Sequence, residues 1–83
     1  PADAEPLCRR ALTILEQTLG SEHPNVAYGL HGLGLILFEQ AKFSEVESLY
    51  RRALAIREQT LPPGHPRIDL LRRKLAELLT AKG

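Results

Sequence analysis

The sequence is poor in residues that cross-link or anchor small domains: it has one cysteine, no tryptophan and no methionine. A single cysteine cannot form an intramolecular disulfide, so packing must stabilise the fold, and an oxidising compartment is neither required nor excluded. The longest apolar run, Leu33–Phe38, has six residues, whereas about 20 are needed to cross a bilayer. We therefore expect no membrane-spanning segment, and the cytoplasm is the location that we expect.

An excess of charge of one sign is also missing. Eleven Lys and Arg residues against ten Asp and Glu residues leave a formal net charge of +1. This balance gives no strong field to concentrate a polyanion, so neither nucleic acid nor a membrane surface is an expected partner. The 83 residues suit one domain, since folding units typically contain about 50 to 250 residues. We treat residues 1–83 as a single domain.

What the chain does contain is an internal repeat. A shift of 42 residues aligns residues 5–24 with residues 47–66, and thirteen of these twenty positions are identical. The positions that differ include Cys8 against Tyr50 and Leu15 against Arg57. A fixed period of this length predicts an array of similar structural units.

Each unit has the residue pattern of two helices. Ser44 and Glu47 have the spacing of a capping box, which predicts a helix start near residues 42–45. Gly20 in the first copy and Pro62–Gly64 in the second predict helix ends. Apolar residues of the second copy recur mainly at steps of three and four, as on one face of a helix. These residues are Val46, Leu49, Tyr50, Ala53, Leu54, Ile56 and Leu61.

The segments that follow the two His-Pro pairs are helical in pattern as well. Pro24 and Pro66 suit the first turn of a helix, where the missing amide proton would have no partner. His23 and His65 are expected either to cap these helices or to bond a loop carbonyl. The predicted helices span residues 3–19, 25–40, 45–60 and 67–81.

This pattern resembles the tetratricopeptide repeat, and the 42-residue period with its L-G-x-x-H-P junction resembles the kinesin light chain type. The residues that carry the resemblance are Leu30, Leu33, Gly34 and Leu37 in the first helix of a unit and Val46, Tyr50 and Ala53 in the second. The resemblance implies an all-α fold, an α-solenoid of antiparallel helix pairs with about two units. With the first helix of a unit called A and the second called B, the four expected helices run B, A, B, A.

The first expected helix has no helix A before it. Arrays of this kind generally need about three repeats, because each unit leaves an apolar face for its neighbour. We expect the chain to be a piece of a longer array, with a second copy covering the free face as a possible homodimer. The residues expected on this self-association face are Leu7, Cys8, Ala11, Leu12 and Leu15.

No residue pattern points to catalysis, a metal or a cofactor. His23 and His65 lie about one repeat apart, and neither has a second ligand at helical spacing. Cys8 takes the place of Tyr50 on an inward stripe, which favours a small packed residue over a reactive thiol. No nucleophile, base and orienting group occur together. We expect no catalytic residue, no metal site and no cofactor, and we expect that the protein is not an enzyme.

In tetratricopeptide arrays the first helix of each pair lines the concave surface, and the resemblance implies that a peptide binds there. Leu35 and Phe38 fall outside the buried stripe of their helix, so they suggest an apolar groove face, unless they pack on a neighbouring helix or another copy. Arg73 and Lys74 could hold a carboxylate of the bound segment. The expected groove residues are Tyr28, His31, Leu35, Phe38 and Glu39 from one helix and Leu70, Arg73, Lys74 and Glu77 from the other.

The sequence therefore predicts a protein interaction module that binds a peptide with both apolar and acidic residues. The alternative is a structural spacer or self-association element that stacks with neighbouring repeats or with a second chain. In both cases the expected partner is a protein or peptide.

Overall fold

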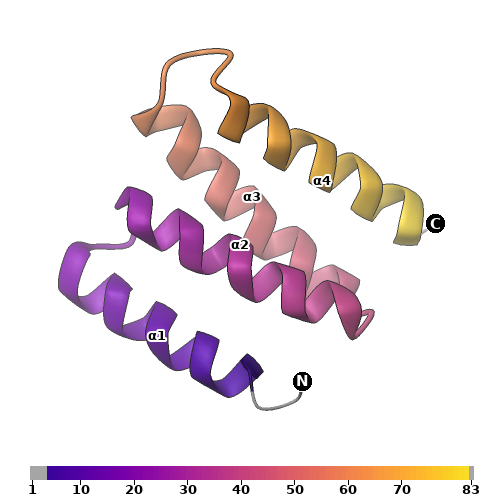
Figure 1. Ribbon diagram of the computed structural model, residues 1–83, viewed down its shortest axis with the longest axis horizontal. Coiled ribbons are helices and arrows are strands. Elements are labelled where there is room, and N and C mark those ends of the chain that lie inside the picture. The colour runs from indigo at the N-terminus through magenta and orange to yellow at the C-terminus, as the bar shows by residue number, and fades with distance from the viewer. Residues whose placement is uncertain (1–3, 83) are drawn as a thin grey trace.

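A computed structural model describes residues 4–82, and these residues form α-helices joined by short loops (Figure 1). The helices are α1 (Ala4–Leu19), α2 (Pro24–Glu39), α3 (Phe43–Thr60) and α4 (Pro66–Lys82). Their bounds agree with the predicted ones to within two residues, and the predicted start at residue 3 lies outside the described residues. None of these helices is long and apolar enough to span a membrane. The fold is the expected all-α helical repeat.

The two His-Pro junctions begin α2 and α4 in the same way. His23 is the residue before α2, and its Nδ1 accepts a hydrogen bond from the backbone N–H of Asn25 at 3.0 Å. His65 precedes α4, and its Nδ1 accepts from the N–H of Arg67 at 3.1 Å. Each bond satisfies an amide that has no partner inside the helix. Of the two roles expected for these histidines, capping is the one observed.

The predicted capping box at the start of α3 is wrong. The helix begins at Phe43, so Ser44 lies inside its first turn, and Lys42 at the cap position makes no capping bond through its side chain. Glu47 instead forms ion pairs with Arg51 at 3.0 Å and with Lys82 at 2.9 Å. A serine one residue inside the helix cannot act as its N-cap.

The helix ends agree with the expectations from glycine and proline. Gly20 follows α1 with φ of +89°, and its N–H donates to the carbonyl of Glu16 at 3.0 Å. Only glycine adopts this left-handed conformation at little cost. The helix α3 ends at Thr60, and its C-cap Leu61 directly precedes Pro62–Gly64.

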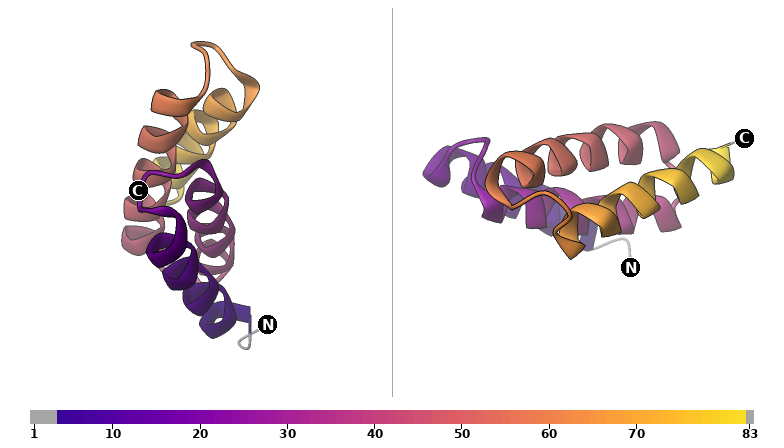
Figure 2. Two further views of the ribbon diagram at one scale, coloured as in Figure 1. Left: turned by 90° about the vertical axis from the view of Figure 1, so that its left-hand side faces the viewer. Right: turned by 90° about the horizontal axis from the view of Figure 1, so that it is seen from above.

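Only helices that are consecutive in the chain have Cα atoms within 8 Å of each other, and the described residues form a slab of 31 × 29 × 16 Å. Figures 1 and 2 show α3 lying behind α2 and α4, with α1 and α4 at opposite ends of the row. No Cα atom of α2 lies within 8 Å of one in α4. The space between α2 and α4 therefore has α3 as its floor.

The closest helix contact is between α2 and α3 at Gly34. A methyl group at this position would overlap the Tyr50 ring, whose Cδ1 atom would lie 2.9 Å away. Gly34 thus lets the two helices enclose a large aromatic side chain that is only 1% exposed. The other core residues of this pair are Val26, Ala27, Leu30, Leu33 and Leu37 from α2 and Val46, Ala53 and Ile56 from α3.

The residues that are exposed on α1 differ from those expected on its free face. Leu12 is 6% exposed and belongs to the core, and Cys8 and Leu15 are partly buried against it. Gly29 of α2 has no side chain, so Leu12 can pack close to the backbone of α2. The prediction that Leu12 is uncovered is therefore wrong. The exposed apolar residues of α1 include Leu7, Ala11 and Ile14.

Candidate functional site

A small pocket opens on the face between α2 and α4, and we call this face the α2/α4 groove. Its walls are the two helices that the sequence identified as A helices, and its floor is α3. At one end, this pocket of about 40 Å³ is lined by Leu35 and Phe38 from α2, Tyr50 from α3, and Lys74 and Glu77 from α4.

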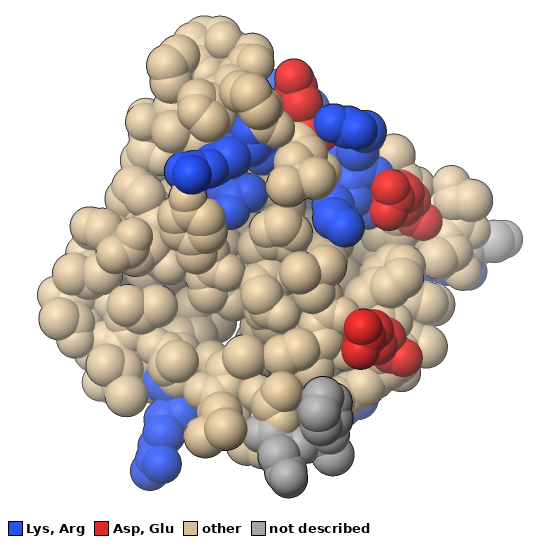
Figure 3. Space-filling view, viewed as in Figure 1, with Lys and Arg blue, Asp and Glu red and all other residues tan. Residues whose placement is uncertain are grey.

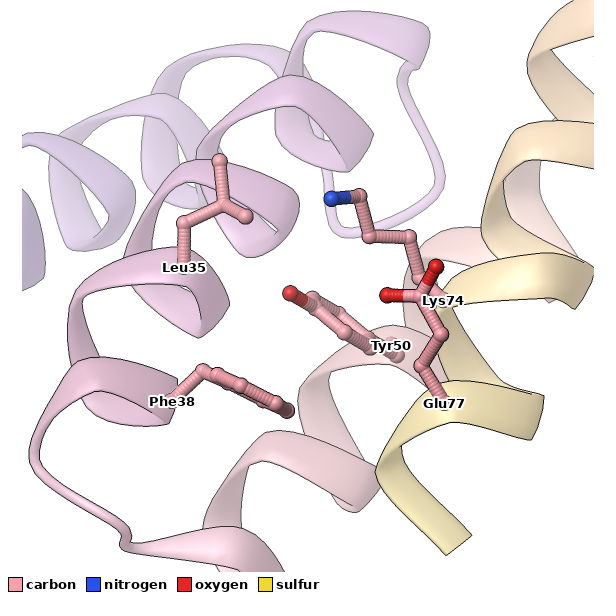
Figure 4. A pocket seen from close by; sticks show the side chains of 5 residues that line it. All are labelled: Leu35, Phe38, Tyr50, Lys74 and Glu77. Carbon is pink, nitrogen blue, oxygen red and sulfur yellow. The ribbon is translucent and has the colours of Figure 1, made fainter. Parts of the chain in front are cut away.

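Figure 4 shows how this pocket is built. The Tyr50 ring rises from α3 between Leu35 and Phe38 on one side and Lys74 and Glu77 on the other. Burial, and after it the negative charge of Glu77, raise the pKa of Tyr50 above its ordinary value. The phenol therefore stays neutral near pH 7 and offers the groove an apolar ring with a polar tip.

Leu35 and Phe38 differ in how far they are already packed. Phe38 is half-buried, and its ring lies 5.3 Å from the ring of Phe43 in a tilted arrangement. Leu35 is 43% exposed and lines the pocket without being covered. The alternative in which both residues pack on a neighbouring helix thus holds in part for Phe38, but not for Leu35.

His31 lies further along the groove, next to the Tyr50 ring at 5.6 Å in an edge-to-face contact. Its Nε2 is buried and has no hydrogen-bond partner among residues 4–82. Burial, and to a lesser extent the positive charges of Arg57 and Lys74, lower the pKa of His31. This imidazole is held neutral in a region where the nearby charges are positive.

The end of the groove near the start of α4 is cationic. The guanidinium carbons of Arg57 and Arg67 lie 5.2 and 5.0 Å from the centre of the Tyr28 ring. Tyr28 itself is 47% exposed. Figure 3, seen from the same side as Figure 1, shows Lys and Arg side chains gathered over this upper part of the face.

The structure brings together four of the nine groove residues expected from the sequence: Leu35, Phe38, Lys74 and Glu77 line the pocket. Tyr28 and His31 border the same groove through their contacts with Arg57 and Tyr50. The remaining three do not line this pocket and are exposed; they are Glu39, Leu70 and Arg73.

Sequence reasoning missed three residues of this face: Tyr50, Arg57 and Arg67. The apolar pattern puts Tyr50 in the core stripe of α3, and the charged Arg57 does not belong to that stripe. A signal was present, because Tyr50 and Arg57 replace Cys8 and Leu15 of the first copy. Positions at which two repeats differ are the ones that give one groove its own chemistry.

The described part of the chain contains no group of three or more His, Cys, Asp or Glu side chains that could hold a metal ion. Cys8 is a free, partly buried thiol at the edge of the core. A family model described as tetratricopeptide repeat matches residues 1–59.

The chain belongs to the tetratricopeptide repeat family. The match covers α1, α2 and nearly all of α3, and α4 repeats the junction that begins α2. A search of curated proteins gave no match. Tetratricopeptide repeats generally mediate protein–protein interactions, and they typically act as scaffold modules without catalysis.

Proposed function

We propose that this tetratricopeptide domain is a non-enzymatic module that binds a peptide segment of a partner protein in the α2/α4 groove. The observation that carries the proposal is the pocket in which exposed Leu35 and half-buried Phe38 lie beside Tyr50 and Lys74. An apolar side chain of the segment would fill this pocket, because Leu35 and the rings of Phe38 and Tyr50 give it an apolar lining. Lys74 and the other cations of this face favour a segment that also carries acidic residues.

Within the family, we propose that the chain is of the kinesin light chain type. The support is the 42-residue period and the L-G-x-x-H-P junction, of which the His-Pro pair forms the start of α2. The cytoplasm remains our proposed location.

Peptides selected from a random library on the immobilised chain test the groove assignment. We expect the selected peptides to lose about tenfold or more in affinity for a Phe38→Ala variant, because this change removes the wall of the pocket. Ile14→Ala on the exposed face of α1 is the matched control and should leave binding unchanged. Equal affinity for wild type and Phe38→Ala would show that the groove is not the binding site.

A second candidate function is self-association, and the exposed face of α1 favours it. Leu7 and Ile14 are 65% and 54% exposed, whereas Ile56, the counterpart of Ile14 in α3, is 1% exposed. The difference arises because α3 has a helix on both sides and α1 has only α2. The occupant that we propose is α4 of a second copy, since α4 is an A helix whose backbone approaches only α3.

A further inference from the structure

A second hollow lies beside the loop from α3 to α4. Both helices and the loop line it, through Glu58, Pro63, Gly64, Ile68 and Arg72. Its volume is about 280 Å³, against about 40 Å³ for the pocket of the α2/α4 groove. Peptide binding in that groove leaves this larger hollow without a role.

The first copy of the repeat shows what fills the corresponding place. After the shift of 42 residues, Glu58 corresponds to Glu16, which pairs with Arg52 of α3 at 3.5 Å. Arg72 corresponds to Leu30, which is fully buried in the core of α2 and α3. The Arg72 side chain, in contrast, is 60% exposed. The hollow is therefore the place that a helix equivalent to α3 would fill.

The helix α1 of a second copy is such a helix. Four exposed residues of α1 are identical to their counterparts in α3: Leu7, Arg10, Ala11 and Ile14 correspond to Leu49, Arg52, Ala53 and Ile56. In α3, Ala53 and Ile56 are 0% and 1% exposed, because α3 packs on α2. A second copy thus carries on its free α1 face the residues that α3 already buries.

The charges on the two surfaces are complementary. Arg10 is exposed and forms no ion pair within residues 4–82. The Glu58 carboxylate lines the hollow, and its side chain is 45% exposed. With α1 of a second copy in the place that α3 takes on α2, Arg10 would reach Glu58 as Arg52 reaches Glu16. Such a pair fixes the register of a contact more than its affinity.

The sizes of the side chains are complementary as well. The close contact between Gly34 and the Tyr50 ring corresponds to Ala76 of α4 and Cys8 of α1. A methyl group at Gly34 would overlap the tyrosine ring. In the corresponding pair the methyl group is present and a small thiol replaces the ring. The volume added on α4 is thus removed on α1, which keeps the packing close.

We propose that this hollow and the adjoining face of α4 dock α1 of a second copy, in the register in which α3 packs on α2. Cys8 of the second copy then lies against Ala76, and its Arg10 pairs with Glu58. The contact is head-to-tail, so each added copy extends the row of helices by two units. The proposal rests on the self-association proposed above and gives it a defined register.

Two charged residues make this contact weaker than the one between α2 and α3. Asp69 and Arg72 stand where α2 has Ala27 and Leu30, so docking removes both charges from water. We expect Arg72→Leu to lower the dissociation constant of self-association about tenfold, because the leucine is buried in the contact. Sedimentation velocity measures this constant. Ala81→Leu, at another exposed position of α4, is the matched control and should leave it unchanged.

A disulfide between copies tests the register directly. In Ala76→Cys the new thiol would lie against Cys8 of the next copy, and a glutathione redox buffer lets a disulfide accumulate between thiols that are held together. We expect linked dimers and longer chains, joined between Cys8 and position 76. A link within one chain is excluded, because α1 and α4 lie at opposite ends of the row (Figure 1). Ala81→Cys is the control and should stay largely unlinked.

The outcomes separate the register from self-association itself. Mass that increases with concentration, without a link from Cys8 in Ala76→Cys, would overturn the register and leave self-association standing. Equal linkage in Ala76→Cys and Ala81→Cys, or an Arg72→Leu chain that associates no more tightly than wild type, would overturn the register as well. A wild-type chain that stays monomeric at every concentration would overturn both.

Discussion

Gly34 controls how closely α2 approaches the Tyr50 ring of α3. Adding a methyl group here forces the ring or the helix to move, and we expect Gly34→Ala to lower the free energy of unfolding by about 1 to 3 kcal/mol. Gly32, two residues earlier on the same helix, has nothing within 4 Å of an added Cβ. Gly32→Ala should therefore raise stability by about 0.5 to 1 kcal/mol through helix propensity. Urea unfolding measures the free energy of unfolding of both variants. A Gly34→Ala variant as stable as the wild type would show that the contact between α2 and the Tyr50 ring is loose.

His31 should make stability depend on pH. Its pKa is lowered in the folded chain by burial and by Arg57 and Lys74, so at mildly acidic pH the unfolded chain binds a proton that the folded chain does not. Stability from this group is therefore complete above its ordinary pKa of about 6.5 and falls as the pH drops below that value. We expect His31→Gln to flatten the dependence of the unfolding midpoint between about pH 7.5 and 5.5. Parallel curves for the two proteins would contradict the assignment.

Residues whose role depends on local backbone geometry can be predicted from the sequence, whereas residues whose role depends on the packing of several helices cannot. The helix end at Gly20 depends on local backbone geometry, so the repeat pattern was enough to predict it. For His23 and His65 the sequence left capping and a bond to a loop carbonyl open, and the structure shows capping. Tyr50 and Arg57 depend instead on three helices meeting. Both lie on the helix that the family pattern assigns away from the groove, and only the space between α2 and α4 brings them to its floor.

At the level of elements, α1 has two apolar sides with different roles. Leu12 is buried against α2, and Leu12→Ala should lower the free energy of unfolding by about 2 to 4 kcal/mol. Ile14 is 54% exposed, so Ile14→Ala should change the free energy of unfolding of the isolated chain by no more than about 0.5 kcal/mol. Thermal or urea unfolding of the two variants at low protein concentration measures the difference. A larger loss of stability in Ile14→Ala than in Leu12→Ala would mean that α1 packs on α2 through the side that carries Ile14.

The rotation of α1 could not be read from the sequence. Its apolar residues occupy more than one face, because Leu7, Ala11 and Ile14 continue the stripe formed by Cys8, Leu12 and Leu15. Periodicity finds such a broad stripe but does not say which side meets the neighbouring helix. Gly29 decides it by leaving room for Leu12 on α2.

For the whole molecule, the second candidate function makes a separate prediction. If α4 of one copy covers α1 of another, sedimentation velocity should show mass increasing with concentration, and the association need not stop at a dimer because the contact is head-to-tail. Ile14→Lys should abolish the increase by placing a charge on the exposed face of α1, with Leu35→Lys on α2, a helix outside this contact, as a control. A wild-type chain that stays monomeric over the whole range of protein concentration would rule out self-association.

The slab shape follows from the sequential packing of the helices, and the face between α2 and α4 has two parts that differ in chemistry. The apolar end is built by Leu35, Phe38 and Tyr50, and the cationic end by Arg57 and Arg67. This polarity fixes the direction in which an extended segment with one apolar and one acidic residue can lie. The central claim is that such a segment binds along this groove.

A chemical-shift map of the isotopically labelled chain with a selected peptide tests this claim most directly. We expect the largest changes at Leu35, Phe38 and Tyr50 together with Arg57, and an affinity that falls about tenfold when the acidic residue of the peptide is replaced by its amide. Changes concentrated at Leu7 and Ile14 on α1, with the groove signals unmoved, would contradict the account.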